Sequence, residues 1–479
     1  MSSVTRSACT SDLIPLGQKV AYAAGMLVNN LQAAAMPAMM VVLNLGIGLD
    51  PRLVGIIGFI PRIFDAVSDP LMGYVSDNTR SRWGRRRPYI FLGAITAGLV
   101  FAGMWQFPDG QTKAFYFWFF LLGSILYFLT YTVYATPFVA FGYEMTPDYH
   151  ERTRLHAFAN TAGQLAWIGA PWIWWIMSSF ENKVHGASVL GIWFGGAIVI
   201  LGVVPALFCR ERIADIPEPK PVERRSVFSN LSIFFQGLVT AVRCKPFAKL
   251  CAATFLVFNG YQLGISFALY VMIYYLFNGD NQAAGQLNGQ WGSLTAICTV
   301  GVIPLTALIS EKIGKRRTFL VTISLSILGY AMKWIGYNPE YPYWLLASCP
   351  FVAFGTGSLF TLMGSMISDV CDYDELGSNK RREGVFGAIY WWMVKVGMAL
   401  ALLVSGYLLV ASGFITPQPG STEIVVQGEK TLFYLRVFDV FIPIITSTIA
   451  LMIMSTYEIT EDSARETRQL LEHRRGHVS

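Results

Sequence analysis

Three ionisable residues lie close together inside a hydrophobic stretch, in the segment RIFDAVSDP. They are Arg62, Asp65 and Asp69, and their i, i+3, i+7 spacing places them on one face of a helix. Two carboxylates one turn apart repel each other unless a cation lies between them or an arginine neutralises one. Oxygen ligands suit a hard cation such as Na⁺, and the same carboxylates could instead bind one proton. The spacing therefore predicts a cation site. The purely structural alternative is a buried Arg–Asp ion pair with one further Asp at a helix end.

A fourth charge, Lys395, lies in the middle of another apolar stretch, YWWMVKVGMAL, with Trp391 one turn away. A charge at the centre of a bilayer costs about 2.5–3.5 kcal/mol even on the permissive insertion scale. We therefore expect Lys395 to be a counter-charge to the two carboxylates or a donor to a substrate oxygen. Lys333 is nearer the end of its stretch, so we expect it to snorkel toward water. Arg436 and Asp439, spaced i, i+3, are expected to form a structural pair.

Aromatic and amide side chains accompany these charges. Aromatic rings stack on the C–H face of a sugar, and amides both donate to and accept from hydroxyl groups. Taken singly, such aromatics more often pack helices together or form an interfacial belt. The substrate-binding candidates are Asn30, Tyr131, Asn160, Gln164, Tyr261, Gln262, Trp391 and Lys395. Two further acids, Glu144 and Asp369, lie near helix ends and are expected to hold loops.

The composition excludes a water-soluble globular enzyme. Of the 479 residues, 54% are hydrophobic and only 14% are charged, whereas soluble domains carry about a quarter charged residues. The seven cysteines are scattered and contain no C-x-x-C pair, which argues against a disulfide framework and against a zinc site. We predict no cofactor and no catalytic residue.

Twelve stretches are long and apolar enough to cross a bilayer, which takes roughly 20 residues as a helix. At 1.5 Å per residue, Asp65 lies roughly 20 Å from the outer end of the second stretch. The sequence therefore predicts an all-α polytopic membrane protein with twelve transmembrane helices. The stretches are 16–45, 52–77, 87–106, 115–142, 155–180, 189–209, 247–277, 289–310, 317–337, 343–369, 384–412 and 432–457.

Lysine and arginine gather in alternate connections, notably 80–87, 210–249 and 312–317. Positive charge near short loops stays on the cytoplasmic side, so we expect both termini to be cytoplasmic. A nucleic-acid partner is excluded because these charges occupy loops between membrane spans. The polar N-terminus lacks the order of regions found in a removable signal peptide. We expect a multi-pass protein of the inner membrane, embedded in lipid and monomeric.

A charged, proline-containing segment, RERIADIPEPKPVERRS, divides the chain into six spans before it and six after it. The predicted domains are an N-terminal six-helix bundle (1–209), a cytoplasmic linker (210–246), a C-terminal six-helix bundle (247–457) and a cytoplasmic tail (458–479). SDNTRSRWGRRRPYI (76–90) is echoed by SEKIGKRRTFL (310–320) at the matching place in the second half. A duplicated unit explains this better than topology alone, and two-halved transporters bind substrate between their halves.

The segment RIFDAVSDPLMGYVSDNTRSRWGRRRPYI resembles the signature of the glycoside–pentoside–hexuronide:cation symporters, a branch of the major facilitator superfamily that includes melibiose permease. The likeness continues in EMTPDYHERTRL (144–155), in SDVCDYDELGSNKRREGVFG (368–387) and at Lys395. The resemblance implies two pseudo-symmetric six-helix bundles. It also implies that Asp65, Asp69 and Thr132 bind the coupling cation and that Arg62 and Lys395 serve coupling.

The sequence departs from melibiose permease at the sugar-binding positions. Asn30, Ala135, Val139 and Asn160 stand where that protein has two aspartates, a tryptophan and an arginine. Galactoside recognition is therefore not implied, and either an uncharged glycoside or an anionic one such as a hexuronide is compatible with the residues present.

We predict a secondary active transporter that couples uptake of a small-molecule sugar to Na⁺ or H⁺ by alternating access. The first alternative is a sodium-coupled carrier of an amphiphile such as a lysolipid, favoured by a cavity open sideways to lipid. A membrane-embedded enzyme is a second alternative, but no Ser/His/Asp arrangement and no nucleotide loop is found. A passive channel is a third, distinguished by current that persists without substrate.

Overall fold

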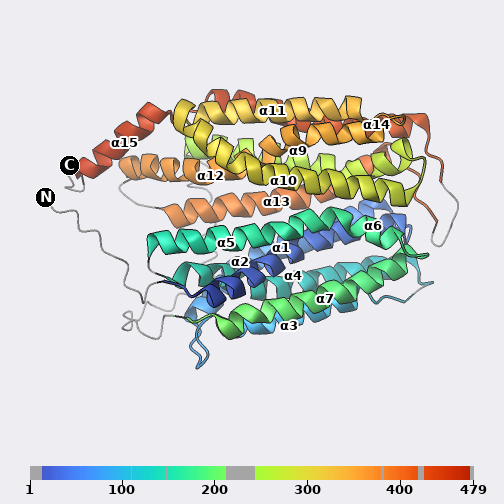
Figure 1. The fold of residues 1–479 in the computed structure, drawn as a ribbon, viewed down its shortest axis with the longest axis horizontal. Coiled ribbons are helices and arrows are strands. Elements are labelled where there is room, and N and C mark those ends of the chain that lie inside the picture. Colours follow the sequence, from blue (N-terminus) through green and yellow to red (C-terminus); the bar gives the residue numbers. More distant parts are fainter. Residues whose placement is uncertain are drawn as a thin grey trace. The chain divides into compact units, whose positions relative to one another are not determined.

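A computed structural model describes residues 13–211, 243–378, 382–418 and 425–474, except Asp109 and Pro147. Within these residues the protein consists of helices and contains no strand, as predicted (Figure 1). Contacts divide the chain into two compact units, unit 1 (Met1–Val227 and Thr416–Ser421) and unit 2 (Phe228–Ile415 and Thr422–Ser479). Most of the predicted linker, residues 212–242, lies outside the described residues.

The described part of unit 1 contains six membrane-length helical segments, of which the fifth is broken by a 3₁₀ turn, η2, into α5 and α6. The bounds are α1 (Leu16–Leu45), α2 (Pro51–Asn78), α3 (Arg87–Met104), α4 (Lys113–Glu144), α5 (Tyr149–Gly169), η2 (Ala170–Trp172), α6 (Ile173–Ser178) and α7 (Lys183–Phe208). The break follows the sequence locally, because Pro171 has no amide hydrogen to continue the helix.

Unit 2 contains six such segments in the described residues, followed by a short terminal helix. The bounds are α9 (Lys245–Val271) with the π-helical turn η4 (Met272–Leu276), α10 (Asn281–Ile313), α11 (Lys315–Gly336), the 3₁₀ helix η5 (Pro342–Ser348) leading into α12 (Cys349–Ser378), α13 (Glu383–Ala411), α14 (Glu429–Ser455) and α15 (Glu461–Arg474). Helix α15 falls in the predicted tail and packs against α12.

The two units use the same pattern of helix packing. In unit 1, α1 packs on α5 and α7, α3 on α4 and α7, and α2 on α4; the corresponding helices of unit 2 pair in the same way. A glycine permits the same close approach in both units. An added Cβ would lie 2.6 Å from the backbone nitrogen of Tyr134 at Gly93, and 2.6 Å from that of Val352 at Gly329. Small residues at such crossings let helix backbones approach in membranes, so the repeated pattern supports a duplicated six-helix unit.

Ten helices of the described chain are long and apolar enough to cross a membrane. The two membrane-length segments outside this set are α2 and α5. Helix α2 contains Arg62, Asp65, Asp69 and Asp77, and α5 begins with a charged turn. In α2 these charges include Arg62, Asp65 and Asp69, so hydropathy alone misses the helix that carries the predicted cation site.

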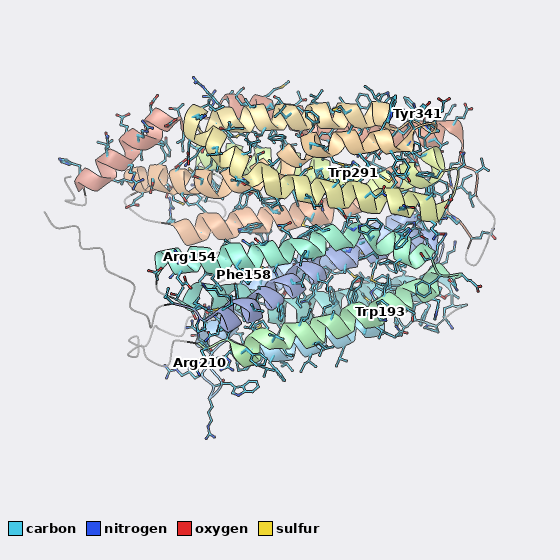
Figure 2. The ribbon with its side chains drawn as sticks, viewed as in Figure 1. Arg154, Phe158, Trp193, Arg210, Trp291 and Tyr341 are labelled. Carbon is cyan, nitrogen blue, oxygen red and sulfur yellow. The ribbon has the colours of Figure 1, made fainter. Side chains whose placement is uncertain are left out.

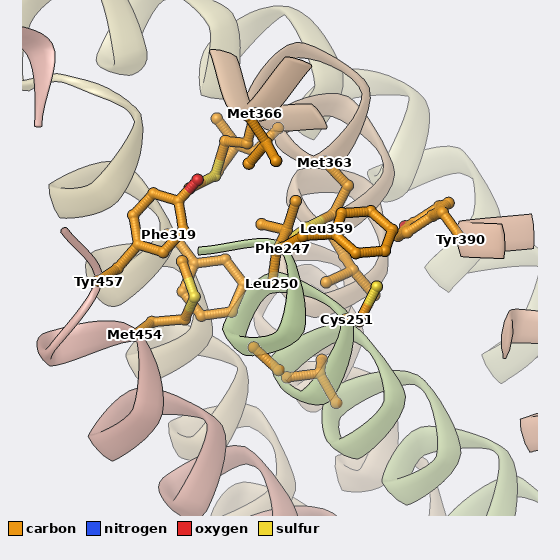
Figure 3. Packing of buried hydrophobic residues seen from close by; sticks show 14 of the residues in the cluster. Phe247, Leu250, Cys251, Phe319, Leu359, Met363, Met366, Tyr390, Met454 and Tyr457 are labelled. Carbon is orange, nitrogen blue, oxygen red and sulfur yellow. The ribbon is translucent and has the colours of Figure 1, made fainter. Parts of the chain in front are cut away.

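The core of unit 2 is a cluster of apolar side chains from α9, α11, α12, α13 and α14 (Figure 3). Phe247, Phe319, Leu359 and Met363 are at most 1% exposed and pack together there. Large apolar side chains also remain exposed on outer helix surfaces, such as Trp193 of α7, which is 67% exposed (Figure 2). Exposed apolar side chains of this kind are compatible with the hydrocarbon core of a bilayer, which contains no water.

Candidate functional site

Helix α4 is positioned in unit 1 by hydrogen bonds to α1. The hydroxyl groups of Tyr127 and Tyr134 donate to the backbone oxygens of Gln32 and Gly25, each at 3.0 Å. These contacts turn one face of α4 to α1 and leave another face for α2. Fixing α4 in this way determines which of its side chains meet the carboxylates of α2.

Asp65 lies at the contact between α2 and α4 and is fully buried. The Thr132 hydroxyl donates to Asp65 Oδ1 at 2.9 Å, and Thr132 itself is 1% exposed. A hydrogen bond to an ionised group is shorter and about twice as strong as a neutral one. The resemblance implied only that Thr132 joins the cation site, and the structure places its hydroxyl in direct contact with Asp65.

Ser68 joins the same group, although the sequence did not single it out. Its Oγ lies 3.0 Å from Thr132 Oγ1 and donates to the backbone oxygen of Asp65 at 3.1 Å. The signal was available, because Ser68 follows Asp65 by one turn and directly precedes Asp69. A hydroxyl between two carboxylates of one helix can supply a neutral oxygen ligand.

Asp69 is half-buried and also contacts α4. The Thr136 hydroxyl donates to Asp69 Oδ1 at 3.1 Å. Thr136 was not predicted either; its sign in the sequence is that it follows Thr132 by four residues, as Asp69 follows Asp65. Two matched hydroxyl–carboxylate contacts therefore join α2 and α4 one turn apart.

Arg62 is 4% exposed and lies on α2 one turn from Asp65. Its guanidinium carbon is 4.6 Å from the centroid of the Phe128 ring, a cation–π contact with α4. Within the described residues its Nη2 atom has no hydrogen-bond partner. The guanidinium thus places a positive charge one turn from Asp65, and its Nη2 atom can still donate a hydrogen bond.

The donor set suits a small cation that takes oxygen ligands. Asp65 and Asp69 supply carboxylate oxygens, and Ser68, Thr132 and Thr136 supply hydroxyl oxygens. No three His, Cys, Asp or Glu side chains of the described chain gather as a metal-binding group. Such a set, made only of oxygen atoms, fits a hard cation better than a soft metal ion, which favours nitrogen or sulfur ligands.

The predicted substrate residues of unit 1 lie on α1, α4 and α5. Tyr131 is 8% exposed, and its hydroxyl donates to Asn29 Oδ1 at 3.4 Å. Asn30 is half-buried and packs against α5, because a Cβ on Gly163 would lie 2.4 Å from Asn30 Nδ2. On α5, Asn160 is exposed and Gln164 is half-buried.

The predicted substrate residues of unit 2 lie on α9 and α13. Tyr261, Gln262 and Lys395 are half-buried, whereas Trp391 is 57% exposed. The Trp391 ring stacks on Phe360 of α12, with centroids 6.1 Å apart and planes within 6°. The suggested action of Lys395 on the α2 carboxylates joins residues of different units and stays a prediction.

Two expectations about charges in unit 2 are wrong. Lys333 does not snorkel: it is 2% exposed, and its Nζ is 2.6 Å from Oδ1 of Asp439, which is fully buried. The Tyr337 hydroxyl donates to Asp439 Oδ2 at 2.5 Å. Lys333 also lies 4.9 Å from the ring centroid of Trp291 of α10, which is labelled in Figure 2.

Arg436 is consequently not the partner predicted for Asp439. Its guanidinium instead lies between the rings of Tyr275 and Trp334, at 4.2 and 4.3 Å from their centroids. Spacing along one helix predicts a shared face, but the carboxylate is satisfied by donors from a neighbouring helix. Such a contact between helices leaves no periodic mark in the sequence.

Glu144 and Asp369 hold loops, as predicted. Glu144 Oε1 lies 2.5 Å from an Arg85 nitrogen and 3.0 Å from an Arg86 nitrogen. Asp369 pairs with Lys315 at 2.7 Å. Each of the two echoed basic segments thus pairs with an acid on the fourth membrane-length segment of its own unit, α4 in unit 1 and α12 in unit 2.

Comparison with known proteins agrees with this architecture. A family model described as MFS/sugar transport protein matches residues 21–461. The putative glycoside/cation symporter YagG of Escherichia coli is 26% identical and covers 89% of this chain and 88% of its own. The glucuronide carrier protein homolog of Escherichia coli is 25% identical, over 88% of this chain and 87% of its own.

Similarity to solved structures gives the fold. A D-xylose-proton symporter superposes with a TM-score of 0.62 at 13% identity, covering 92% of this chain and 98% of its own. The twelve-helix major facilitator fold is therefore confirmed, and the matches are to membrane transporters rather than enzymes. The chain belongs to the MFS/sugar transport protein family, as its resemblance to the glycoside–pentoside–hexuronide:cation symporters predicted.

Proposed function

We propose that the chain couples uptake of a glycoside or related sugar to entry of Na⁺ or H⁺ by alternating access. The observation that carries this proposal is the pair of hydroxyl–carboxylate contacts between α2 and α4, Thr132 with Asp65 and Thr136 with Asp69. Relatives named as a glycoside/cation symporter and a glucuronide carrier homolog support the sugar as cargo.

A cation fits this site because α2 presents two carboxylates, Asp65 and Asp69, and one guanidinium, Arg62, on the same helical face. Two carboxylates about one turn apart inside a membrane are costly unless positive charge lies close to them. A cation bound by the two carboxylates and Thr132 would supply that charge. Na⁺ would use the hydroxyl oxygens as further ligands, whereas H⁺ would need only one carboxylate.

The sugar is proposed to bind near Tyr131, the neighbour of Thr132 in the chain, and near the amides of α1 and α5. In unit 2 the exposed Trp391 offers a ring face, and Lys395 one turn away offers a donor to a sugar oxygen. Lys395 could serve a hydroxyl or a carboxylate, so both neutral and anionic sugars fit the proposal. The remaining candidates are Asn30, Asn160, Gln164, Tyr261 and Gln262.

Coupling requires that a bound cation raises the affinity for sugar and that bound sugar raises the affinity for the cation by the same factor. Transport then follows from rocking of the two six-helix halves around the site. We propose an inner-membrane location with cytoplasmic termini, from the distribution of lysine and arginine.

The proposal is tested by uptake of nitrophenyl glycosides into proteoliposomes, with α-galactoside, β-xyloside and β-glucuronide probes. Each probe is measured with and without a Na⁺ gradient and with and without a pH gradient. We expect Asp69→Asn to abolish cation stimulation because it removes one of the two carboxylates. Asp50→Asn is the matched control, since Asp50 caps the N-terminus of the same helix through the Arg52 amide.

Undiminished cation stimulation in Asp69→Asn would refute the cation site. Transport of a lysolipid, with no uptake of any glycoside by the wild-type protein, would instead favour an amphiphile carrier. Ionic current that persists without substrate would identify a channel.

A further inference from the structure

We propose that Thr136 is a positioning residue that fixes the Asp69 carboxylate for cation binding. The inference rests on the proposed function, because it assigns Thr136 a part in the same cation site. Thr136 was not among the residues predicted for the cation site. Its assigned role implies that loss of its hydroxyl lowers the affinity for the cation. The Thr136 hydroxyl donates to Asp69 Oδ1 at 3.1 Å, from a different helix.

The three threonines on the second half of α4 show that this contact is specific. A threonine in a helix ordinarily donates back to a carbonyl of the preceding turn. Thr130 does this, with contacts of 3.1 Å to Leu126 and 2.8 Å to Tyr127. Thr132 and Thr136 instead donate across to Asp65 and Asp69. The two hydroxyls that leave their own helix are thus those that meet the carboxylates.

The methyl group of Thr136 faces Gly73 of α2. A Cβ added at Gly73 would lie 3.7 Å from Thr136 Cγ2, so the glycine leaves room beside the methyl group. Branching at Cβ restricts the rotation of threonine about its Cα–Cβ bond, and with the methyl group toward Gly73 the hydroxyl donates to Asp69. Valine at this position keeps the shape and loses only the donor.

Both residues of the contact directly precede a proline inside their helix. Asp69 is followed by Pro70 in α2, and Thr136 by Pro137 in α4. A proline within a helix removes one backbone hydrogen bond and weakens the helix locally. The contact therefore joins α2 and α4 where each is most easily bent, and it ties the Asp69 carboxylate to α4.

A fixed carboxylate binds a cation more tightly because less freedom is lost on binding. Asp65 has the Thr132 contact and is fully buried, whereas Asp69 is half-buried. Loss of the Thr136 hydroxyl should therefore weaken cation binding while leaving the other ligands present. Affinity for the cation should fall, and the maximal rate at saturating cation should remain.

The experiment measures uptake of the best-transported nitrophenyl glycoside as a function of cation concentration for four proteins. These are the wild type, Thr136→Val, Thr136→Ser and the control Thr130→Val. The control makes the same substitution in the same helix, at another half-buried threonine whose hydroxyl serves its own backbone. Membrane insertion of each variant is measured in parallel.

We expect Thr136→Val to raise the half-saturating cation concentration about tenfold, the effect of losing a hydrogen bond to a charged group. Its maximal rate should stay near that of the wild type. Thr136→Ser should restore the wild-type value because it keeps the donor, and Thr130→Val should leave it unchanged. If Thr136→Val does not insert, Thr136→Ala against Thr136→Ser gives the same comparison.

An unchanged half-saturating concentration in Thr136→Val overturns the inference, as does an equal rise in Thr130→Val. The proposed function stands in either case if Asp69→Asn still abolishes cation stimulation. If uptake by Asp69→Asn keeps its full cation stimulation, Asp69 does not belong to the cation site, and the role proposed for Thr136 is refuted as well.

Discussion

At the scale of single residues, the chemistry of the site comes from hydroxyl groups as much as from carboxylates. Asp65 contacts Thr132, Asp69 contacts Thr136, and Ser68 touches Thr132 from the aspartate side. The carboxylates were predictable because charge in a hydrophobic stretch is rare. Ser68 and Thr136 left only a spacing signal, because serine and threonine are common in membrane helices and it is the contact between α2 and α4 that gives these two a role.

Ser68 offers a test at this scale. Its Oγ is 3.0 Å from Thr132 Oγ1, so Ser68→Ala removes a neighbour of the hydroxyl that contacts Asp65. We expect the half-saturating cation concentration to rise about fivefold, as the loss of one ordinary hydrogen bond of about 1 kcal/mol implies. The measurement is cation-dependent glycoside uptake in proteoliposomes.

The matched control is Ser76→Ala, in the same helix, whose hydroxyl donates to the backbone oxygen of Gly73 at 3.0 Å. Equal effects of the two substitutions would assign Ser68 to helix packing rather than to the cation site.

At the scale of helices, the sequence predicted the elements well because long apolar runs leave little choice of structure. The predicted stretch 16–45 coincides with α1, and 52–77 lies within a residue of α2 at each end. The error concerned a contact between helices. Lys333 was expected to reach water from the end of α11, yet it is buried against Asp439 of α14.

That ion pair predicts a particular pattern of stability. Removing one partner of a buried pair leaves the other charge uncompensated, which costs about 3–5 kcal/mol. We expect Lys333→Met and Asp439→Asn each to destabilise the protein. The double variant should recover most of the loss, because it buries no charge and the new amide oxygen would still accept from the Tyr337 hydroxyl. Thermal unfolding in detergent, without sugar, measures these differences.

Lys249→Met is the control, since the Lys249 side chain is 27% exposed and pairs at 2.9 Å with Glu458, which is 48% exposed. An exposed pair contributes about 0–1 kcal/mol, so its loss should barely change the unfolding temperature. A double variant no more stable than either single variant would contradict a purely structural role for Lys333 and Asp439.

At the scale of the whole molecule, two units with the same helix packing explain how one chain can serve as a transporter. The echo between residues 76–90 and 310–320 indicated the duplication, and equivalent ion pairs at Glu144 and Asp369 follow from it. The sugar residues were less predictable. Asn30, Asn160 and Gln262 are amides of a kind that also packs helices, and their type and spacing do not specify a ligand.

The central claim is that the cation and the sugar bind to the same protein and that each raises the affinity for the other. Equilibrium binding of the best-transported nitrophenyl glycoside to the purified protein, over a range of Na⁺ concentrations and separately of pH, tests it most directly. We predict that one cation lowers the dissociation constant of the glycoside, that the glycoside lowers that of the cation by the same factor, and that Asp69→Asn removes both effects. A glycoside affinity that is the same at every Na⁺ concentration and every pH would contradict the account.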